Sequence, residues 1–123
     1  MIASVAAGVL DLGFAVFHLM FWSLFSWPER LGASGKVNSA ITQTLNWMLI
    51  YVFTVYGTLL IWLAPSELAG SSLLAGAGAG FWVLRFVLQP CLFPMRNWQS
   101  ITITTVFAVN AILHAAAAVS ASL

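Results

Sequence analysis

Charged residues are scarce in this sequence: four Lys and Arg and three Asp and Glu make up 6% of its 123 residues. A soluble domain usually has about 25% charged residues. Hydrophobic residues account for 62% of the chain, and the mean hydropathy is +1.00. The few charges cannot cover a water-facing surface, so the composition excludes a soluble globular domain. It also excludes intrinsic disorder, which requires the opposite balance of apolar and charged residues.

Cysteine and basic runs are equally scarce. The single cysteine, Cys91, excludes an internal disulfide, a CxxC redox pair and a thiolate metal site. The net charge is +1, and no run of Lys or Arg is present to neutralise a phosphate backbone, so we expect no nucleic-acid partner. No Ser or Cys lies beside a His in a recognisable nucleophile motif, so we expect no catalytic residue and favour a non-enzymatic protein.

Long apolar stretches dominate the sequence instead. A helix that crosses a membrane needs about 20 mainly apolar residues. Four such stretches cover residues 3–27, 37–64, 71–93 and 98–120. Pro28, Pro65 and Pro94 follow the first three, and proline stops or kinks a helix. A membrane β-strand would alternate apolar and polar residues, and that pattern is missing. The sequence therefore predicts an all-α fold, an integral membrane four-helix bundle formed by one domain over residues 1–123.

The basic residues of the loops predict an orientation. Arg30 and Lys36 lie between the first and second stretches, and Arg96 lies between the third and fourth. The loop between the second and third stretches and both chain ends have no Lys or Arg. Because short cytoplasmic loops carry the excess of basic residues, we expect the first and third loops in the cytoplasm and both termini outside it.

Small residues predict where helices pack. Lipid tails are as apolar as leucine, so helices in a bilayer associate through close contact of small residues and through polar links. Gly76 and Gly80 have the GxxxG spacing of such contacts. The contact is expected within one chain or between two copies, and we expect a homo-oligomer, most simply a dimer.

Polar residues inside the apolar stretches are the candidate functional residues. Charged groups in the hydrocarbon region are costly and usually face the interior of a bundle. The candidates are Asp11, His18, Gln43, Asn46, Arg85, Gln89, Asn110 and His114. On each helix two of them are three, four or seven residues apart and therefore share one face. The spacing predicts a polar intramembrane site to which every helix contributes.

Depth divides this site in two. Counting about 1.5 Å per residue from the middle of each helix gives an outer cluster of Asp11, Asn110 and His114. The other polar residues form an inner cluster around Arg85. The long side chain of Arg85 can extend toward Asp11, so we expect these two residues to neutralise each other.

Three interpretations of the polar site stay open at this point. The residues can simply link helices, at about 0.6 kcal/mol for each hydrogen bond. They can bind a small-molecule ligand, an ion or a proton, in which case the protein is a transport component or an accessory subunit. This interpretation requires no cofactor and no metal ion. They can hold haem or a quinone in a membrane redox protein. His18 and His114 differ by about 10 Å in depth, which argues against their sharing one iron.

One motif is similar to a known set of proteins. The run HxxFWxLFxW begins at His18 and is followed by Asn38, Gln43 and Asn46. This pattern resembles small, uncharacterised four-helix bacterial membrane proteins, and the likeness covers mainly residues 18–46. The resemblance implies a four-helix fold in a bacterial inner membrane and marks these four polar residues. It implies no established activity.

Overall fold

The computed structural model describes residues 1–65 and 70–123 of this protein, and these residues form helices joined by short turns. The helices are α1 (Ile2–Leu19), the short α2 (Phe21–Leu24), the 3₁₀ helix η1 (Glu29–Ser34), α3 (Lys36–Leu63), α4 (Ser71–Leu92) and α5 (Trp98–Ser122). Within the described ranges, α1, α3, α4 and α5 are long and apolar enough to cross a membrane. The predicted all-α four-helix membrane bundle is confirmed, and the protein is a small multi-pass membrane protein.

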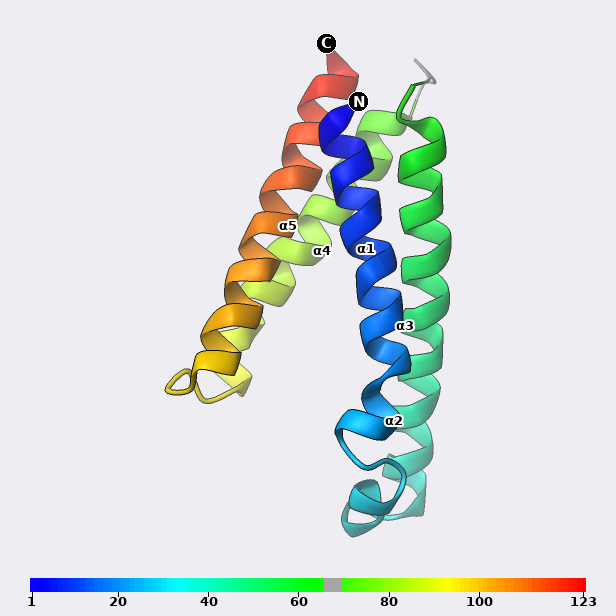
Figure 1. Ribbon diagram of the computed structural model, residues 1–123, viewed down its shortest axis with the longest axis vertical. Coiled ribbons are helices and arrows are strands. Elements are labelled where there is room, and N and C mark those ends of the chain that lie inside the picture. Colours follow the sequence, from blue (N-terminus) through cyan, green and yellow to red (C-terminus); the bar gives the residue numbers. More distant parts are fainter. Residues whose placement is uncertain (66–69) are drawn as a thin grey trace.

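The four long helices form two antiparallel pairs. The closest contacts join α1 to α3 and α4 to α5, and a smaller contact joins α1 to α5. Figure 1 shows that the two pairs lie close together near the termini and diverge toward the loop between α4 and α5. The contact between α3 and α4 is thin. The bundle is therefore closed at one end and has a weak seam between α3 and α4.

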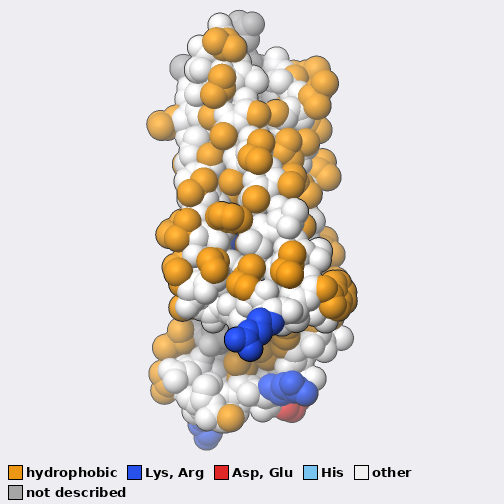
Figure 2. Space-filling model, turned by 90° about the vertical axis from the view of Figure 1, so that its left-hand side faces the viewer, with side chains coloured by type: hydrophobic (Ala, Val, Ile, Leu, Met, Phe, Trp, Pro, Cys, Tyr) orange, Lys and Arg blue, Asp and Glu red, His pale blue; other side chains and the backbone are white. Residues whose placement is uncertain are grey.

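The surface between the two ends is apolar. Each long helix exposes large hydrophobic side chains. Figure 2 shows one face on which such side chains extend along most of the molecule, while Lys and Arg side chains gather toward one end. Arg30, Lys36 and Arg96 are all exposed. This distribution fits a bundle whose middle contacts lipid and whose loops contact water.

The first helix is shorter than the sequence predicts. α1 ends at Leu19, whereas the apolar stretch continues to Trp27. The ring of Phe21 lies 4.9 Å from that of Phe25 and 5.6 Å from that of Trp27. Residues six apart lie on different faces of a continuous helix. The chain therefore leaves the helix near Met20, and the aromatic rings pack against each other in the turn instead.

The interior has two apolar layers, and each long helix contributes to both. Phe14, Phe53, Trp82 and Phe107 form the aromatic layer, which also contains Ala15 and Ala111. Ala7, Leu60, Ala75 and Ala117 form the small-residue layer near the termini. The region between the two layers lies one to two helical turns from each, and it contains Asp11, Tyr56 and His114.

Glycine brings α1 and α3 together at Gly8 and Gly57. A methyl group on Gly57 would lie 2.7 Å from the carbonyl oxygen of Gly8, and one on Gly8 would lie 2.6 Å from that of Gly57. The GxxxG pair behaves differently. A methyl group on Gly76 would only touch Ala118, at 4.0 Å, and one on Gly80 would meet nothing within 4 Å. Gly80 thus packs against no helix of its own chain, and its contact with a second copy stays a prediction.

The close approach of α1 and α3 makes a stability prediction. Gly57→Ala should lower the free energy of unfolding by about 1–3 kcal/mol, because the added methyl forces two backbones apart. Gly13→Ala is the matched control on α1, since a methyl group there meets nothing within 4 Å. Its stability should equal that of the wild type or exceed it by up to about 1 kcal/mol, because alanine favours a helix interior over glycine. Thermal unfolding in a mild detergent measures both, and equal stability of the two variants would contradict the packing.

Candidate functional site

The site is built around the carboxylate of Asp11 on α1. Its side chain is 0% exposed and lies between the aromatic layer and the small-residue layer. Oδ1 accepts hydrogen bonds from Nε1 of Trp82 at 3.1 Å and from Nδ2 of Asn110 at 3.0 Å. Oδ2 lies 2.8 Å from Nε2 of His114. One carboxylate therefore links α1 to α4 and α5.

The geometry of His114 fixes where its protons lie. Nδ1 lies 2.7 Å from the backbone oxygen of Asn110, and Nε2 lies 2.8 Å from the carboxylate of Asp11. A carbonyl oxygen only accepts hydrogen bonds, so Nδ1 carries a proton. The contact between Nε2 and Oδ2 also needs a proton, held by either atom. The Asp11–His114 pair thus holds one shared proton and is neutral as a whole, which matches its full burial at membrane depth.

Tyr56 and Gly78 form the wall of the site. The ring of Tyr56 stacks on that of His114 with centroids 5.8 Å apart and an interplanar angle of 11°. Its hydroxyl donates to the backbone oxygen of Leu74 at 2.7 Å. A methyl group on Gly78 would collide with the Tyr56 hydroxyl and the His114 ring. Gly78 is therefore the position at which α4 needs glycine, two residues from each glycine of the predicted GxxxG pair.

A groove on the thin seam between α3 and α4 borders α1 beside Asp11, whose side chain stays fully buried. Its volume is about 170 Å³, and its lining includes Asp11, Tyr56, Gly78 and Trp82. Next to the pair, Oδ1 of Asn110 is buried and has no hydrogen-bond partner among the described residues. The site therefore holds one buried acceptor that no described residue satisfies.

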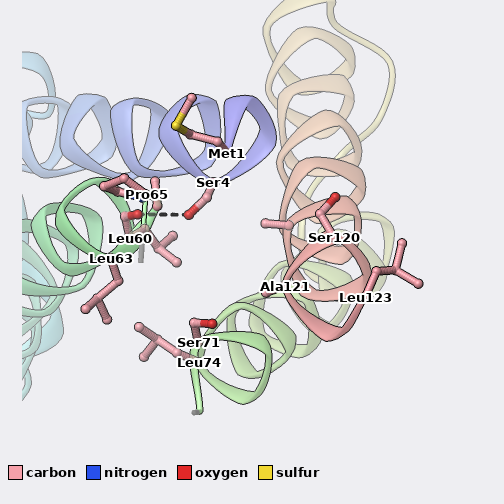
Figure 3. Close-up of a pocket in the computed structure, with 12 residues that line it drawn as sticks. Met1, Ser4, Leu60, Leu63, Pro65, Ser71, Leu74, Ser120, Ala121 and Leu123 are labelled. Atoms are coloured by element: carbon pink, nitrogen blue, oxygen red, sulfur yellow. Dashed lines mark hydrogen bonds between the residues drawn. The ribbon is translucent and has the colours of Figure 1, made fainter. Parts of the chain in front are cut away.

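A larger depression opens at the end of the bundle where the termini lie (Figure 3). Its volume is about 500 Å³, and Ser4, Ser71 and Ser120 add polar groups to its lining. Leu60 and Ala117 of the small-residue layer also line it. Ala117 is three residues beyond His114 on α5, which corresponds to about 4.5 Å along the helix. A single apolar layer thus separates the depression from the Asp11–His114 pair.

His18 and Asn46 form a second polar contact, between α1 and α3. Nδ2 of Asn46 donates to the backbone oxygen of His18 at 2.9 Å, which leaves Oδ1 of Asn46 facing Nδ1 of His18 at 2.6 Å. Nδ1 of His18 is therefore the donor. This contact joins the two members of one helix pair, whereas Asp11 joins the two pairs.

The remaining inner residues do not form one cluster. Gln43 accepts a hydrogen bond from Nε1 of Trp22 at 3.0 Å and so holds α2 against α3. Gln89 is buried, and its Oε1 has no partner among the described residues. The predicted pairing of Arg85 with Asp11 is wrong, since the only ion pair in the described part of the chain joins Asp11 to His114. Trp82, Asn110 and His114 already occupy the carboxylate, and Arg85 lies against aromatic rings instead.

Trp82 and Tyr56 are the residues that sequence reasoning missed. The signal for Trp82 was its spacing: it lies four residues after Gly78 and seven before Gln89, and all three are buried on one face of α4. Asn110 and His114 share the buried face of α5 in the same way. Nothing in the sequence distinguishes Tyr56 from Tyr51, which is exposed on the same helix.

No protein-family model, curated protein or solved structure matches this chain. Among the described residues, no three His, Cys, Asp or Glu side chains come together as a metal-binding group. His114 has no free ring nitrogen for an iron or zinc ion, because both nitrogens face protein oxygens. The chemistry of the site therefore rests on the Asp11–His114 pair and its donors.

Replacing Asp11 should separate the structural role of the carboxylate from its proton. Asp11→Ala leaves the donors of Trp82, Asn110 and His114 unpaired, and at about 0.6 kcal/mol for each bond the loss should be roughly 2 kcal/mol. Asp11→Asn should keep most of the stability. Its oxygen still accepts from Trp82 and Asn110, and its amide can donate to Nε2 of a neutral His114.

Unfolding in detergent tests this pair of variants. The structure predicts that Asp11→Asn melts close to the wild type and clearly above Asp11→Ala. Equal losses in both variants would mean that the charge, rather than the hydrogen-bond geometry, holds the helices together. Unchanged stability of Asp11→Ala would mean that the hydrogen bonds of Asp11 do not stabilise the bundle.

Proposed function

We propose that this protein binds a proton inside the bilayer at the Asp11–His114 pair and acts as a non-enzymatic component of a transport system. The observation that supports this is the 2.8 Å contact between Oδ2 and Nε2 of two side chains that are each 0% exposed. A carboxylic acid and an imidazole exchange a proton readily, since each has a neutral and a charged form. Intramembrane pairs of this type are typical of proton relays.

The surroundings of the pair support a proton site that is closed at rest. The aromatic layer covers one side, and the small-residue layer separates the other side from the 500 Å³ depression. Ala7, Ala75 and Ala117 form most of that second layer, so little side-chain volume stands between the depression and the pair. The unpartnered Oδ1 of Asn110 gives an arriving donor a place beside the pair.

Orientation and assembly belong to the same proposal. The protein lies in the inner membrane of a bacterial cell. The loops that carry Arg30, Lys36 and Arg96 face the cytoplasm, and the depression opens on the outer side. A homodimer through the α4 surface around Gly80 is supported only by the exposure of that glycine and its freedom from intrachain contacts. Both statements extend the sequence predictions.

Reporter fusions test the orientation. A fusion after Leu123 and one inserted in the turn after Ala64 should both report a non-cytoplasmic location, and one at Gly32 should report the cytoplasm. The reason is the three-to-zero distribution of basic residues among the loops. Cytoplasmic signals from the first two fusions would reverse the orientation, and disagreement between them would contradict the four-span topology.

Proton flux into vesicles tests the function. With a potassium gradient and valinomycin to drive entry, vesicles containing the wild type should acidify faster than empty vesicles. Asp11→Asn should reduce the rate to that of empty vesicles, because the variant keeps the hydrogen bonds but cannot share an acidic proton with His114. His18→Gln is the control, since His18 lies outside the pair, and its rate should match that of the wild type.

Two outcomes would count against the proposal. Equal flux in Asp11→Asn and the wild type would move the proton path elsewhere. Wild-type flux no faster than that of empty vesicles would leave the pair as a link between helices, which is the structural interpretation of the polar site.

The redox alternative is weakened by His114, whose two nitrogens are both engaged and cannot ligate haem iron together with His18.

A further inference from the structure

Arg85 is a charged residue within the length of α4, and the proposed proton site does not use it. It lies on α4 and is partly buried. Its guanidinium carbon is 4.4 Å from the ring centroid of Phe107 on α5 and 5.2 Å from that of Phe93 at the end of α4. Stacking against aromatic rings stabilises a guanidinium and orients its plane.

No described residue supplies Arg85 with a hydrogen bond or an ion pair. Asp11 is fully engaged with other donors, and Glu29 is exposed in η1. Glu67 lies outside the described residues. Arginine cannot lose its charge by deprotonation, and charged groups at membrane depth normally pair with an acceptor. Its N–H groups are therefore available to an acceptor from outside the described part of the chain.

The position of Arg85 favours an acceptor that carries an apolar tail. Neighbouring side chains on α4, including Leu84, Phe86 and Leu88, are exposed to the surroundings of the bundle. In Figure 1 the helix pairs diverge toward the C-terminal end of α4, and Arg85 belongs to the C-terminal half of that helix. The exposed Arg96 lies just beyond the end of α4 and takes no part in the contact that Arg85 makes with Phe93 and Phe107.

We propose that Arg85 binds the headgroup oxyanion of an anionic amphiphile, such as the phosphate of an acidic lipid, with the acyl chains lying along the exposed apolar face of α4. The guanidinium donates two hydrogen bonds to two oxygens of the headgroup, and the rings of Phe93 and Phe107 hold it in place. This site is separate from the Asp11–His114 pair, so it does not depend on the proposed proton function.

Lipid retention measures the proposal directly. The full chain is purified in detergent with phosphatidylcholine, titrated with phosphatidylglycerol, and examined by native mass spectrometry. The wild type should retain one phosphatidylglycerol per chain, and Arg85→Gln should bind it at least about tenfold more weakly, since a charge-assisted pair is lost. Arg96→Gln is the matched control and should bind within about threefold of the wild type, because it removes an exposed charge only.

Further variants and a competitor distinguish a specific Arg85 site from binding through diffuse charge or through free phosphate. Arg85→Lys keeps the charge but not the planar fork, so it should fold like the wild type and bind less tightly than it but more tightly than Arg85→Gln. Equal weakening by Arg85→Gln and Arg96→Gln would overturn the proposal, because diffuse charge would then explain binding. Unchanged binding by Arg85→Gln would also overturn it. Displacement of the lipid by inorganic phosphate at equal concentration would reject an amphiphile as the ligand.

Discussion

The hydrogen bonds of Asp11 are the contact on which the arrangement of the bundle depends. Lipid offers no hydrophobic driving force between helices, so register in a membrane bundle comes from close packing and polar links. Gly8, Gly57 and the His18–Asn46 contact join α1 to α3. The carboxylate of Asp11, with the hydrogen bond from Tyr56 to Leu74 beside it, ties that pair to α4 and α5. With distance from the termini the two pairs diverge (Figure 1).

The same contact explains how a carboxylate is tolerated at this depth. Two N–H donors satisfy one oxygen, and the other shares a proton with His114. The pair is neutral, so no net charge is buried. A shared proton is also the property that a transport site needs, because it can leave from either partner. Structure and proposed function therefore depend on the same atoms. Asp11→Asn distinguishes the two roles, because it keeps the hydrogen bonds and removes the acidic proton.

Much of the fold could be predicted from hydropathy and periodicity. Four apolar stretches predict the helices, and counting residues along them predicts the cluster of Asp11 and His114 with Asn110 below. Depth along a helix does not give rotation about its axis, which is why Arg85 was paired with Asp11. The indole of Trp82 occupies that place, and Arg85 lies on a neighbouring face of α4. A charge count alone favours an Asp–Arg pair over an indole donor.

Two other differences also have physical reasons. GxxxG spacing identifies small residues but not the face that meets another helix, and that face is the one with Gly78, Trp82 and Gln89. Hydropathy cannot locate the end of α1, because the aromatic residues after Met20 are as apolar in a turn as in a helix. Ring-to-ring packing within that turn decides the matter.

The protons on His114 test the central claim most directly. Nitrogen NMR of protein labelled at histidine, with His18→Gln to assign the signals, should show Nδ1 protonated and a proton shared between Nε2 and Asp11. In Asp11→Asn, Nδ1 should stay protonated and Nε2 should become a plain acceptor, because the new amide donates to it. A wild-type His114 with an unprotonated Nδ1 would contradict the account, since its contact with the oxygen of Asn110 would then have no proton to hold it.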